Sequence, residues 1–468
     1  MDTATLPDTA RPNTDLIAAD RRAQLHPFSA LRDQREAEAF LVTGGAGCRL
    51  TGPEGRSWLD GAAGLWCVNA GYGQAEITEA IAAQSARLPY FHSFNGAANE
   101  PSIRLAERIL ELAPPGMARV FFGSSGSDAN DTAVKLLWTC NALEGRPEKR
   151  KVISRRGAYH GVTVAAGSLS GIPVVHKDFG LPLDFARHVS PPDLYRDAPA
   201  RGCRTEAEYS AALAAELEAL IVAEGPETVA GMVMEPVMGT GGVLPPPEGY
   251  IAAISEVLRR HDVRLIADEV ITGFGRTGAW FASARYGLKP DMILTAKGLT
   301  SGYLPLSAVI LGEGMFRVLE AASEDGRSFA HGFTYSGHPT AAAAGLANLA
   351  LIEREGLVER VAALEAPFRA AFDAALGGLP HVGDIRSAGL MLGIELVADR
   401  QTKAPFDPAR KTAARVALAA RERGALVRAL PGGDVLALSP PFIVTEEEIA
   451  ELASILRDAI LDVTGGES

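Results

Sequence analysis

Residues 263–270 read VRLIADEV, and residues 291–298 read DMILTAKG. Each stretch is a short hydrophobic run that ends in a charged residue, Asp268 or Lys297, and this pattern predicts two strands. The two charged residues lie 29 positions apart, the span of one β-loop-β unit in a parallel sheet. Because ligands bind outside the carboxyl ends of such strands, we expect the carboxylate and the amine at one crevice. The pair alone leaves a structural ion pair open as the alternative.

The composition indicates an ordinary globular protein of about two to three domains. The chain has 468 residues, of which 47% are hydrophobic and 22% charged. Its formal net charge of -12 argues against a nucleic-acid partner and favours small molecules. The four cysteines form no CxxC pair, so no metal site is predicted. Because no secretory signal and no stretch long enough to span a membrane is evident, we expect no membrane partner and a cytoplasmic location.

Hydrophobic runs alternate with helical patterns from about residue 76, which predicts a doubly wound α/β sheet. A small hairpin is expected over residues 49–60, and Thr205 is expected to cap a helix that reaches about residue 223. Residues 190–202 are interpreted as a loop, and residues after 336 as a second α+β domain. The expected strands of the large sheet cover residues 119–122, 151–154, 229–234, 264–267, 291–295 and 306–311.

A turn of small residues, GSSGSD at 123–128, connects the first of these strands to a helix. The free amides at a helix start bind anions, and Gly126 permits a close backbone approach, so Ser125, Gly126 and Ser127 are candidates for holding a phosphate. The absence of a lysine excludes a P-loop. A plain capped turn is the alternative, because Ser and Asp favour such positions in any case.

Two further segments could contact a flat ring. In GAYHG, residues 157–161, Tyr159 could lie over a heterocycle, whereas His160 is interpreted as a structural hydrogen-bonding residue and not as a catalytic one. After Asp268 the glycine-rich run VITGFGRTG predicts a tight loop around a ligand. Phosphate, ring face, ring nitrogen and aldehyde of pyridoxal phosphate would then each have a partner, with Lys297 forming the Schiff base.

The stretch LIADEVITGFGRTGAWFASARYGLKPDMILTAKGLTSGYLP, residues 265–305, resembles the cofactor signature of the class III aminotransferases, which are fold type I pyridoxal phosphate enzymes. Further matches are GLWCVNAGYG at 64–73, SGS at 125–127, AYHG at 158–161, EPVMGTGGV at 235–243 and HGFTYSGHP at 331–339. Within that class the chain most resembles the pyruvate-dependent ω-aminotransferases. One departure is Asp128, where the family commonly has Glu, and this puts any longer-range contact of that acid in doubt.

The resemblance implies a role for each matching residue. Lys297 would hold the cofactor and shuttle a proton, and Asp268 would keep the ring nitrogen protonated, so the two would touch opposite ends of one ring without forming a salt bridge. Ser125, Gly126 and Ser127 would lie at the phosphate, and Tyr159 and Val270 on opposite ring faces. Trp66, Tyr159 and Arg428 would contact the substrate, with Arg428 binding the acceptor carboxylate. The alternatives are a core tryptophan at Trp66 and an ordinary surface arginine at Arg428. Thr334 would reach the partner subunit's phosphate. Glu235 receives no role.

The resemblance also implies the architecture. We expect a large domain with a mainly parallel sheet flanked by helices, over residues 76–335, and a smaller α+β domain built from residues 1–75 and 336–468. The functional unit would be a homodimer with shared active sites, and tetramer formation is left open. The expected reaction is a ping-pong transfer from a primary amine or ω-amino acid to a 2-oxo acid, with pyruvate as the expected acceptor. The amine donor is not identified by the sequence.

Other functions would account for parts of this pattern. An aminomutase or a decarboxylating aminotransferase of the same fold would share the Asp268 and Lys297 machinery. A nicotinamide dehydrogenase would need GxGxxG after an early strand, and GSSGSD lacks that spacing. A non-catalytic binding protein would be expected to lose Lys297 or Asp268, and both are present.

Overall fold

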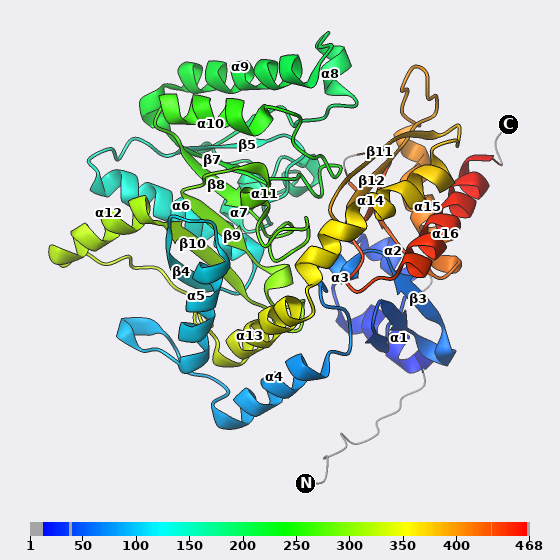
Figure 1. Ribbon diagram of the computed structural model, residues 1–468, viewed down its shortest axis with the longest axis horizontal. Helices are drawn as coiled ribbons and strands as arrows, with labels where there is room; N and C mark the ends of the chain where they lie inside the picture. The colour runs from blue at the N-terminus through cyan, green and yellow to red at the C-terminus, as the bar shows by residue number, and fades with distance from the viewer. Residues whose placement is uncertain (1–12, 37–39, 432, 466–468) are drawn as a thin grey trace.

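A seven-stranded sheet forms the centre of the larger part of the protein (Figure 1). The computed structural model describes residues 13–36, 40–431 and 433–465. The first twelve residues, on which the expectation about a secretory signal partly rests, lie outside them. The strands follow the order β4-β10-β9-β8-β7-β5-β6, and their bounds are β4 (Met117–Gly123), β5 (Lys151–Arg155), β6 (Ala186–Val189), β7 (Val229–Met234), β8 (Arg264–Asp268), β9 (Met292–Thr295) and β10 (Ser307–Gly312).

The six strands expected from the sequence are confirmed, and β6 was missed. This edge strand reads ARHV, and its two central polar residues hide the hydrophobic pattern on which strand prediction depends. The four-residue helix α8 (Asp197–Ala200) lies where the sequence was interpreted as a loop, so that interpretation is wrong at these positions. A single helical turn is too short to produce a 3.6-residue hydrophobic period.

The sheet is mainly parallel, as predicted. Strands β6, β5, β7, β8 and β9 pair in parallel, whereas β10 runs antiparallel to both β9 and β4. Strand β4 therefore runs in the same direction as β9. The register places Asp268 of β8 opposite Leu294 of β9, three residues before Lys297. The carboxyl ends of five of these strands, β4, β5, β7, β8 and β9, consequently bring their following loops to one edge of the sheet.

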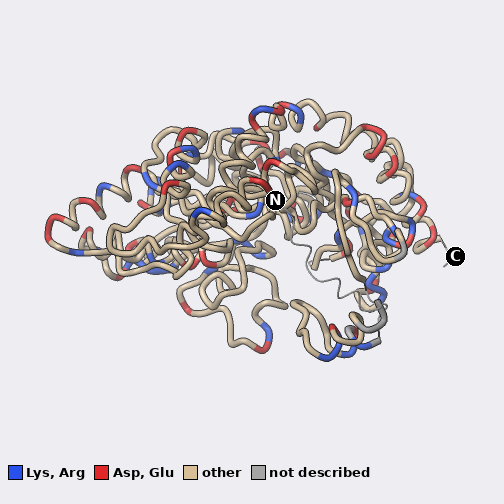
Figure 2. Tube along the Cα trace, turned by 90° about the horizontal axis from the view of Figure 1, so that it is seen from below, with Lys and Arg blue, Asp and Glu red and all other residues tan. Residues whose placement is uncertain are grey.

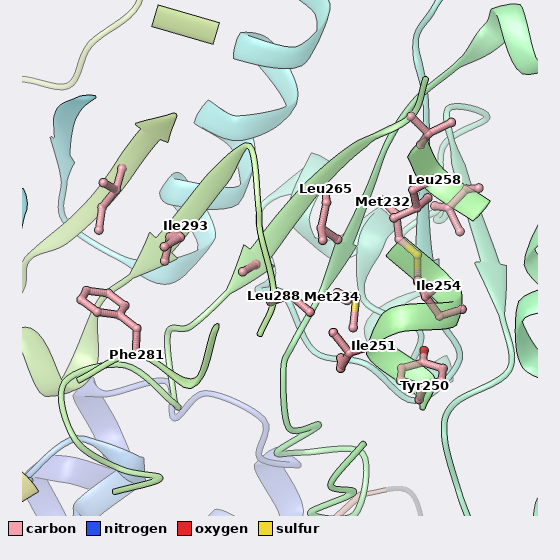
Figure 3. Packing of buried hydrophobic residues seen from close by; sticks show 14 of the residues in the cluster. Met232, Met234, Tyr250, Ile251, Ile254, Leu258, Leu265, Phe281, Leu288 and Ile293 are labelled. Atoms are coloured by element: carbon pink, nitrogen blue, oxygen red, sulfur yellow. The ribbon is translucent and has the colours of Figure 1, made fainter. Parts of the chain in front are cut away.

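Helices cover both faces of this sheet, which explains why its strands are hydrophobic throughout. Along β8, Leu265 and Ala267 belong to the core on one face and Ile266 to the core on the other. Figure 3 shows Ile254 and Leu258 on the first of these faces. Burial of each such Leu or Ile contributes about 1.5–3 kcal/mol. The first face carries α5 (Glu100–Leu112), α9 (Glu206–Glu224), α10 (Tyr250–Arg260) and α13 (Pro339–Arg354), and the second carries α6 (Gly126–Leu143) and α12 (Glu313–Glu324).

Helix α9 begins where the sequence predicts. The Thr205 hydroxyl accepts a hydrogen bond from the Glu208 N–H at 3.1 Å. Gly225, with a φ of 85°, follows the last residue of the helix. The expected cap at Thr205 is therefore confirmed.

A second, smaller part of the protein contains the chain's C-terminal segment. Its antiparallel sheet has the order β11-β12-β15-β14 and packs with three helices around a separate hydrophobic core. The strands are β11 (Val382–Ala388), β12 (Met391–Leu396), β14 (Arg428–Ala429) and β15 (Val435–Leu438), and the helices are α14 (Leu357–Leu376), α15 (Thr412–Glu422) and α16 (Glu446–Gly465).

The N-terminal segment joins this smaller part. The expected hairpin is formed by β2 (Arg49–Thr51) and β3 (Ser57–Asp60), which continue a sheet that begins with β1 (Gly44–Ala46). The C-terminal strand β13 (Ala425–Leu426) pairs in parallel with β3, and Figure 1 shows the blue N-terminal strands beside the red α16. The prediction of a smaller domain built from both ends of the chain is thus confirmed. The boundary at 335/336 stays a prediction; α13, which follows it, packs against α5 and α4 (Ala75–Arg87).

Charged residues of both signs are interspersed along the trace (Figure 2). Within the described ranges, no helix has the length and apolar character that crossing a membrane requires. The same residues contain no group of His, Cys, Asp and Glu side chains placed to hold a metal ion.

Candidate active site

A cavity lies at the carboxyl edge of the large sheet. It brings together six residues that the sequence assigns to a ligand: Gly126, Ser127, Tyr159, Asp268, Val270 and Lys297. His160, Gly161, Glu235, Val237 and Ile271 complete its lining. Ser125, Trp66, Arg428 and Thr334 are not part of this lining. Because the lining residues follow β4, β5, β7, β8 and β9, the parallel arrangement of these strands is what assembles the site.

Asp268 is buried at the end of β8 and is held by three hydrogen bonds. Its Oδ2 atom accepts from Asn130 Nδ2 at 3.0 Å and lies 2.7 Å from His160 Nδ1. Its Oδ1 atom accepts from the Val270 N–H at 3.1 Å. Burial acts to raise the pKa of this carboxyl, but the bonds from His160 and Asn130 outweigh it and hold the pKa below its ordinary value. Asp268 is therefore a fixed anion facing the cavity.

Lys297 contributes an amine without a partner. Its side chain makes no hydrogen bond or ion pair with any residue that the structure describes, and so none with Asp268. The expected absence of a salt bridge is confirmed, and the alternative of a structural ion pair between the two is wrong. Burial lowers the pKa of the Lys297 amine because it removes the ammonium from water. The backbone φ of 40° is left-handed, a strain of about 1–3 kcal/mol that is characteristic of functional positions.

The start of α6 offers two free donors. The Ser125 hydroxyl caps the helix by accepting from the Asp128 N–H at 3.1 Å, and Asp128 Oδ2 accepts from the Ser125 N–H at 3.0 Å. The N–H groups of Gly126 and Ser127 have no acceptor among the described residues. These two amides, at the positive end of an 18-residue helix, are a candidate anion site at the cavity. The side chain of Ser125 is instead exposed and engaged in the cap.

Asp128 also makes the longer-range contact that the sequence left in doubt. Its Oδ1 atom accepts from Ser307 Oγ at 2.7 Å, and this bond connects α6 to the first residue of β10. The Asp128 side chain therefore completes the helix cap and also hydrogen-bonds α6 to the sheet.

A glycine is required where the Tyr159 loop passes over the anion site. Gly161 has a φ of 122°, and a Cβ at this position would lie 2.3 Å from Ser127 Oγ. The close approach lets the Val162 N–H donate to Ser127 Oγ at 3.1 Å. The loop and the helix start consequently form one wall of the cavity.

Glu235 lines the same cavity from the end of β7. Its two carboxylate oxygens accept from the Gly239 N–H at 2.7 Å and from the Tyr159 N–H at 3.3 Å. Burial raises the pKa of this carboxyl. Glu235 thus positions the backbone at Tyr159, whose own phenol has its pKa raised by burial.

Of the three remaining predicted residues, Trp66 and Arg428 lie near residues of the cavity lining, whereas Thr334 lies outside the lining. Trp66 is 1% exposed and packs in a cluster with the lining residues Val237 and Ile271. Arg428, on β14, is half-buried, and its guanidinium has no hydrogen bond or ion pair with the described residues; burial lowers its pKa. Thr334 is exposed, and its carbonyl accepts from the Tyr90 hydroxyl at 2.8 Å.

Sequence reasoning missed the residues that support Asp268. His160 makes the structural hydrogen bonds expected of it, because its two ring nitrogens contact Asp268 Oδ2 at 2.7 Å and Ser154 Oγ at 3.0 Å. Asn130 lies one helical turn after Gly126, so its amide reaches both the Gly126 carbonyl and Asp268. That i, i+4 spacing was the available signal for Asn130.

These groups fit pyridoxal phosphate. Two free amides suit its phosphate, an anionic carboxylate suits a protonated ring nitrogen, and an unpartnered amine of lowered pKa suits its aldehyde. Tyr159 and Val270 line the space between them.

Comparisons with known proteins agree with this chemistry. Residues 31–460 match the family model described as aminotransferase class-III. A diaminobutyrate–2-oxoglutarate transaminase from Halomonas elongata is 47% identical over 452 residues, which cover 96% of either chain. A putrescine–pyruvate aminotransferase from Pseudomonas aeruginosa is 38% identical over 447 residues, 95% of either chain. A solved ω-transaminase from Pseudomonas jessenii in complex with PMP has a TM-score of 0.93 at 40% identity, covering 96% of this chain and 98% of that one.

Proposed function

The chain belongs to the class III aminotransferases, and from this premise we propose that it is an ω-aminotransferase that moves an amino group from a primary amine or ω-amino acid to a 2-oxo acid. Enzymes of this class use pyridoxal phosphate. The observation that carries the proposal is the placement of the unpartnered Lys297 amine and the buried Asp268 carboxylate on one cavity, without a bond between them.

Lys297 and Asp268 carry out the chemistry in this proposal. When bound, the cofactor supplies a covalent attachment point for the amine and an electron sink. Lys297 Nζ, neutral over a wider pH range than an exposed lysine, would take the proton from the donor's Cα and deliver it to the cofactor's C4′ atom, and would move a proton in the opposite direction with the acceptor. Asp268, kept ionised by His160 and Asn130, holds the proton at the ring nitrogen. The Gly126 and Ser127 amides bind the phosphate, and Tyr159 and Val270 contact the ring faces.

Arg428 is the proposed carboxylate-binding residue. A half-buried guanidinium without a protein partner is costly unless a ligand pairs with it. An acceptor 2-oxo acid supplies that partner, and Trp66 would support the same side of the pocket from its cluster with Val237 and Ile271. We expect pyruvate as the acceptor. The name of the Halomonas relative instead specifies 2-oxoglutarate, so both acids belong in the test.

A homodimer with shared sites is part of the proposal. Thr334 is exposed and outside the cavity of its own subunit, where a residue that reaches the partner's phosphate would be. Exposed aromatic side chains occur in the two segments that this contact joins: Tyr335, next to Thr334, is 59% exposed, and Phe91 and Phe94, which follow Tyr90, are 46% and 42% exposed. Such a group of large apolar residues marks a contact surface.

The four cysteines are free thiols, which suits the expected cytoplasm.

The test is a trapping experiment combined with a substrate panel. Borohydride reduction of the purified holoenzyme followed by peptide mapping should fix the cofactor on Lys297, and Lys297→Ala should abolish this. The exposed Lys289→Ala is the matched control and should behave as wild type. Diamines, β-alanine, taurine and aromatic amines are then offered with pyruvate or 2-oxoglutarate. Failure to trap Lys297 would overturn the proposal, and an isomerised product or released carbon dioxide without amino transfer would favour the aminomutase or the decarboxylating enzyme.

A further inference from the structure

The turn that carries Lys297 is held by a buried amide from a distant helix. We propose that Asn348 of α13 is a positioning residue for Lys297: it fixes the turn η5 (Lys297–Leu299) and thereby the direction in which the Lys297 amine enters the cavity. The inference rests on the proposed role of Lys297.

Asn348 makes three hydrogen bonds to residues 298–301. It is 0% exposed, and its Nδ2 atom donates to the carbonyls of Gly298 at 2.9 Å and Leu299 at 3.0 Å. Its Oδ1 atom accepts from Ser301 Oγ at 2.5 Å. Ser301 Oγ in turn accepts from the Ala70 N–H at 3.0 Å, so the network extends to the segment that carries Trp66.

The turn benefits from this support because three of its backbone hydrogen bonds are long, although the Leu299 N–H donates to the Ala296 carbonyl at 2.9 Å. The Thr300 and Gly302 N–H groups donate to the Lys297 carbonyl, and the Ser301 N–H donates to Gly298, all at 3.3 Å. These distances lie at the long end of the usual range for N–H···O bonds. Lys297 and Ser301 also have left-handed φ values of 40° and 47°. Strained backbone of this kind persists only where the surroundings over-determine it, and the shorter Asn348 bonds provide that constraint.

Asn348 lies at an unfavourable position inside α13, which indicates that its amide has a function there. An Asn in a helix interior is unfavourable, and its burial among apolar residues is tolerated only when every polar atom is paired. Gly345, one turn earlier, lets α13 approach: a Cβ there would lie 3.0 Å from Leu105 Cδ2 and 3.6 Å from the Leu299 carbonyl oxygen. The helix is thus packed closely enough for Asn348 to reach both carbonyls.

Loss of the amide should displace Lys297 more than it disturbs the fold. A displacement of about 1 Å in a reacting group can cost about 10²-fold in rate. The acceptor site at Arg428 lies on another element, so substrate affinity should change little. A buried Asn elsewhere provides the matched control: Asn141 on α6 donates to the Lys149 carbonyl at 3.2 Å and accepts from Arg264 Nη1 at 3.0 Å, at the opposite edge of the sheet.

The experiment compares Asn348→Leu and Asn141→Leu with wild type, all as holoenzyme. For Asn348→Leu we expect kcat to fall about 10²-fold with KM for the acceptor within about 3-fold, and borohydride to fix less cofactor on Lys297 by peptide mass spectrometry. The pH titration of the bound cofactor's absorbance should also shift. Asn141→Leu should lose comparable thermal stability and keep kcat, trapping and titration. Ser301→Ala, which removes only the hydroxyl, should show the same changes at smaller size and tests the inference if Asn348→Leu does not fold.

Two results would overturn the inference. One is wild-type kcat, trapping and titration in Asn348→Leu, or in Ser301→Ala where that variant stands in for it. The other is an equal loss of these three properties in Asn141→Leu, which would indicate general destabilisation. If wild type itself does not trap cofactor on Lys297, the proposed function fails instead, so the two failures are distinguishable.

Discussion

The Nδ1 atom of His160 lies 2.7 Å from Oδ2 of Asp268, and both side chains are buried. An ionised carboxylate only accepts hydrogen bonds, so Nδ1 carries the proton, and Nε2 contacts Ser154 Oγ at 3.0 Å. The imidazole therefore connects Ser154 of β5 to the Asp268 carboxylate at the end of β8. Without it, burial would favour the neutral acid, which could not hold a proton on a ring nitrogen.

Replacing His160 should raise the pH below which the enzyme loses activity. His160→Ala removes the hydrogen bond that lowers the pKa of Asp268, and the remaining effect of burial then raises that pKa. Because a hydrogen bond to a charged group contributes about 1.5–3 kcal/mol, we expect kcat/KM to fall at least about 10-fold at neutral pH. The acidic limb of the kcat/KM profile should move to higher pH, since protonation of Asp268 abolishes its function.

Ser154→Ala is the control for this prediction, because it removes only the outer contact of the ring and should shift the limb less. An acidic limb in His160→Ala that coincides with that of wild type would show that His160 does not set the ionisation of Asp268.

The positions of Asp268 and Lys297 are predictable because one local rule sets them. Each follows a short hydrophobic strand, and neighbouring parallel strands end at the same edge of a sheet. The caps at Ser125 and Thr205 are equally local, since a hydroxyl and an N–H three residues later suffice.

Contacts between distant residues follow no such rule. His160 and Asp268 are separated by 108 positions, Asp128 and Ser307 by 179, and Asn348 and Gly298 by 50. A single chain carries no signal that pairs them, because each side chain alone suits many partners. The long-range contact of Asp128 is unpredictable for the same reason. The sequence shows that its side chain is short, but it does not show that Ser307 lies within reach.

The cap of α6 should contribute to both stability and phosphate binding. Asp128→Ala removes the acceptor for the Ser124 and Ser125 N–H groups and for Ser307 Oγ. We expect the free energy of unfolding of the apoprotein to fall by about 1–2 kcal/mol, measured by urea denaturation. The affinity for pyridoxal phosphate should fall as well, because the Gly126 and Ser127 amides lose their fixed direction.

Thr205→Ala is the matched variant, because it removes a cap from α9, far from the cavity. It should lower the free energy of unfolding similarly and leave cofactor affinity unchanged. Equal cofactor affinity in Asp128→Ala and wild type would contradict the proposed anion site.

The lowered pKa of Lys297 predicts reactivity at neutral pH. Burial disfavours the ammonium, so the pKa of the Lys297 amine lies below the ordinary value for lysine and the neutral amine forms at a lower pH. When apoprotein is mixed with pyridoxal phosphate between pH 6 and pH 10 and reduced with borohydride, labelling of Lys297 should reach its plateau at a lower pH than labelling of the exposed Lys289. Parallel labelling curves for the two residues would refute the prediction.

Arg428 should discriminate between substrates with and without a carboxylate. Its guanidinium has no partner among the described residues, and Arg428→Gln removes the charge while keeping a polar side chain. A charge-assisted pair contributes about 1.5–3 kcal/mol, so KM for the 2-oxo acid should rise by about 10- to 100-fold. KM for an amine donor that lacks a carboxylate should stay within about 3-fold, because no such pair forms with it. Steady-state kinetics with both substrates varied will measure the two constants separately.

The same variant should be more stable than wild type. Burial lowers the pKa of Arg428, which means that the folded protein holds its charge at a cost that the unfolded chain does not have. Removing an uncompensated charge from a functional pocket commonly adds about 0.5–2 kcal/mol, and we expect a higher Tm for the Arg428→Gln apoprotein. Arg369→Gln is the control, because Arg369 is exposed and paired with Asp373 at 2.8 Å, and it should change neither KM nor Tm appreciably. A lower Tm for Arg428→Gln, or an equal rise in KM for both substrates, would show that the arginine supports the fold and is not kept free for a ligand.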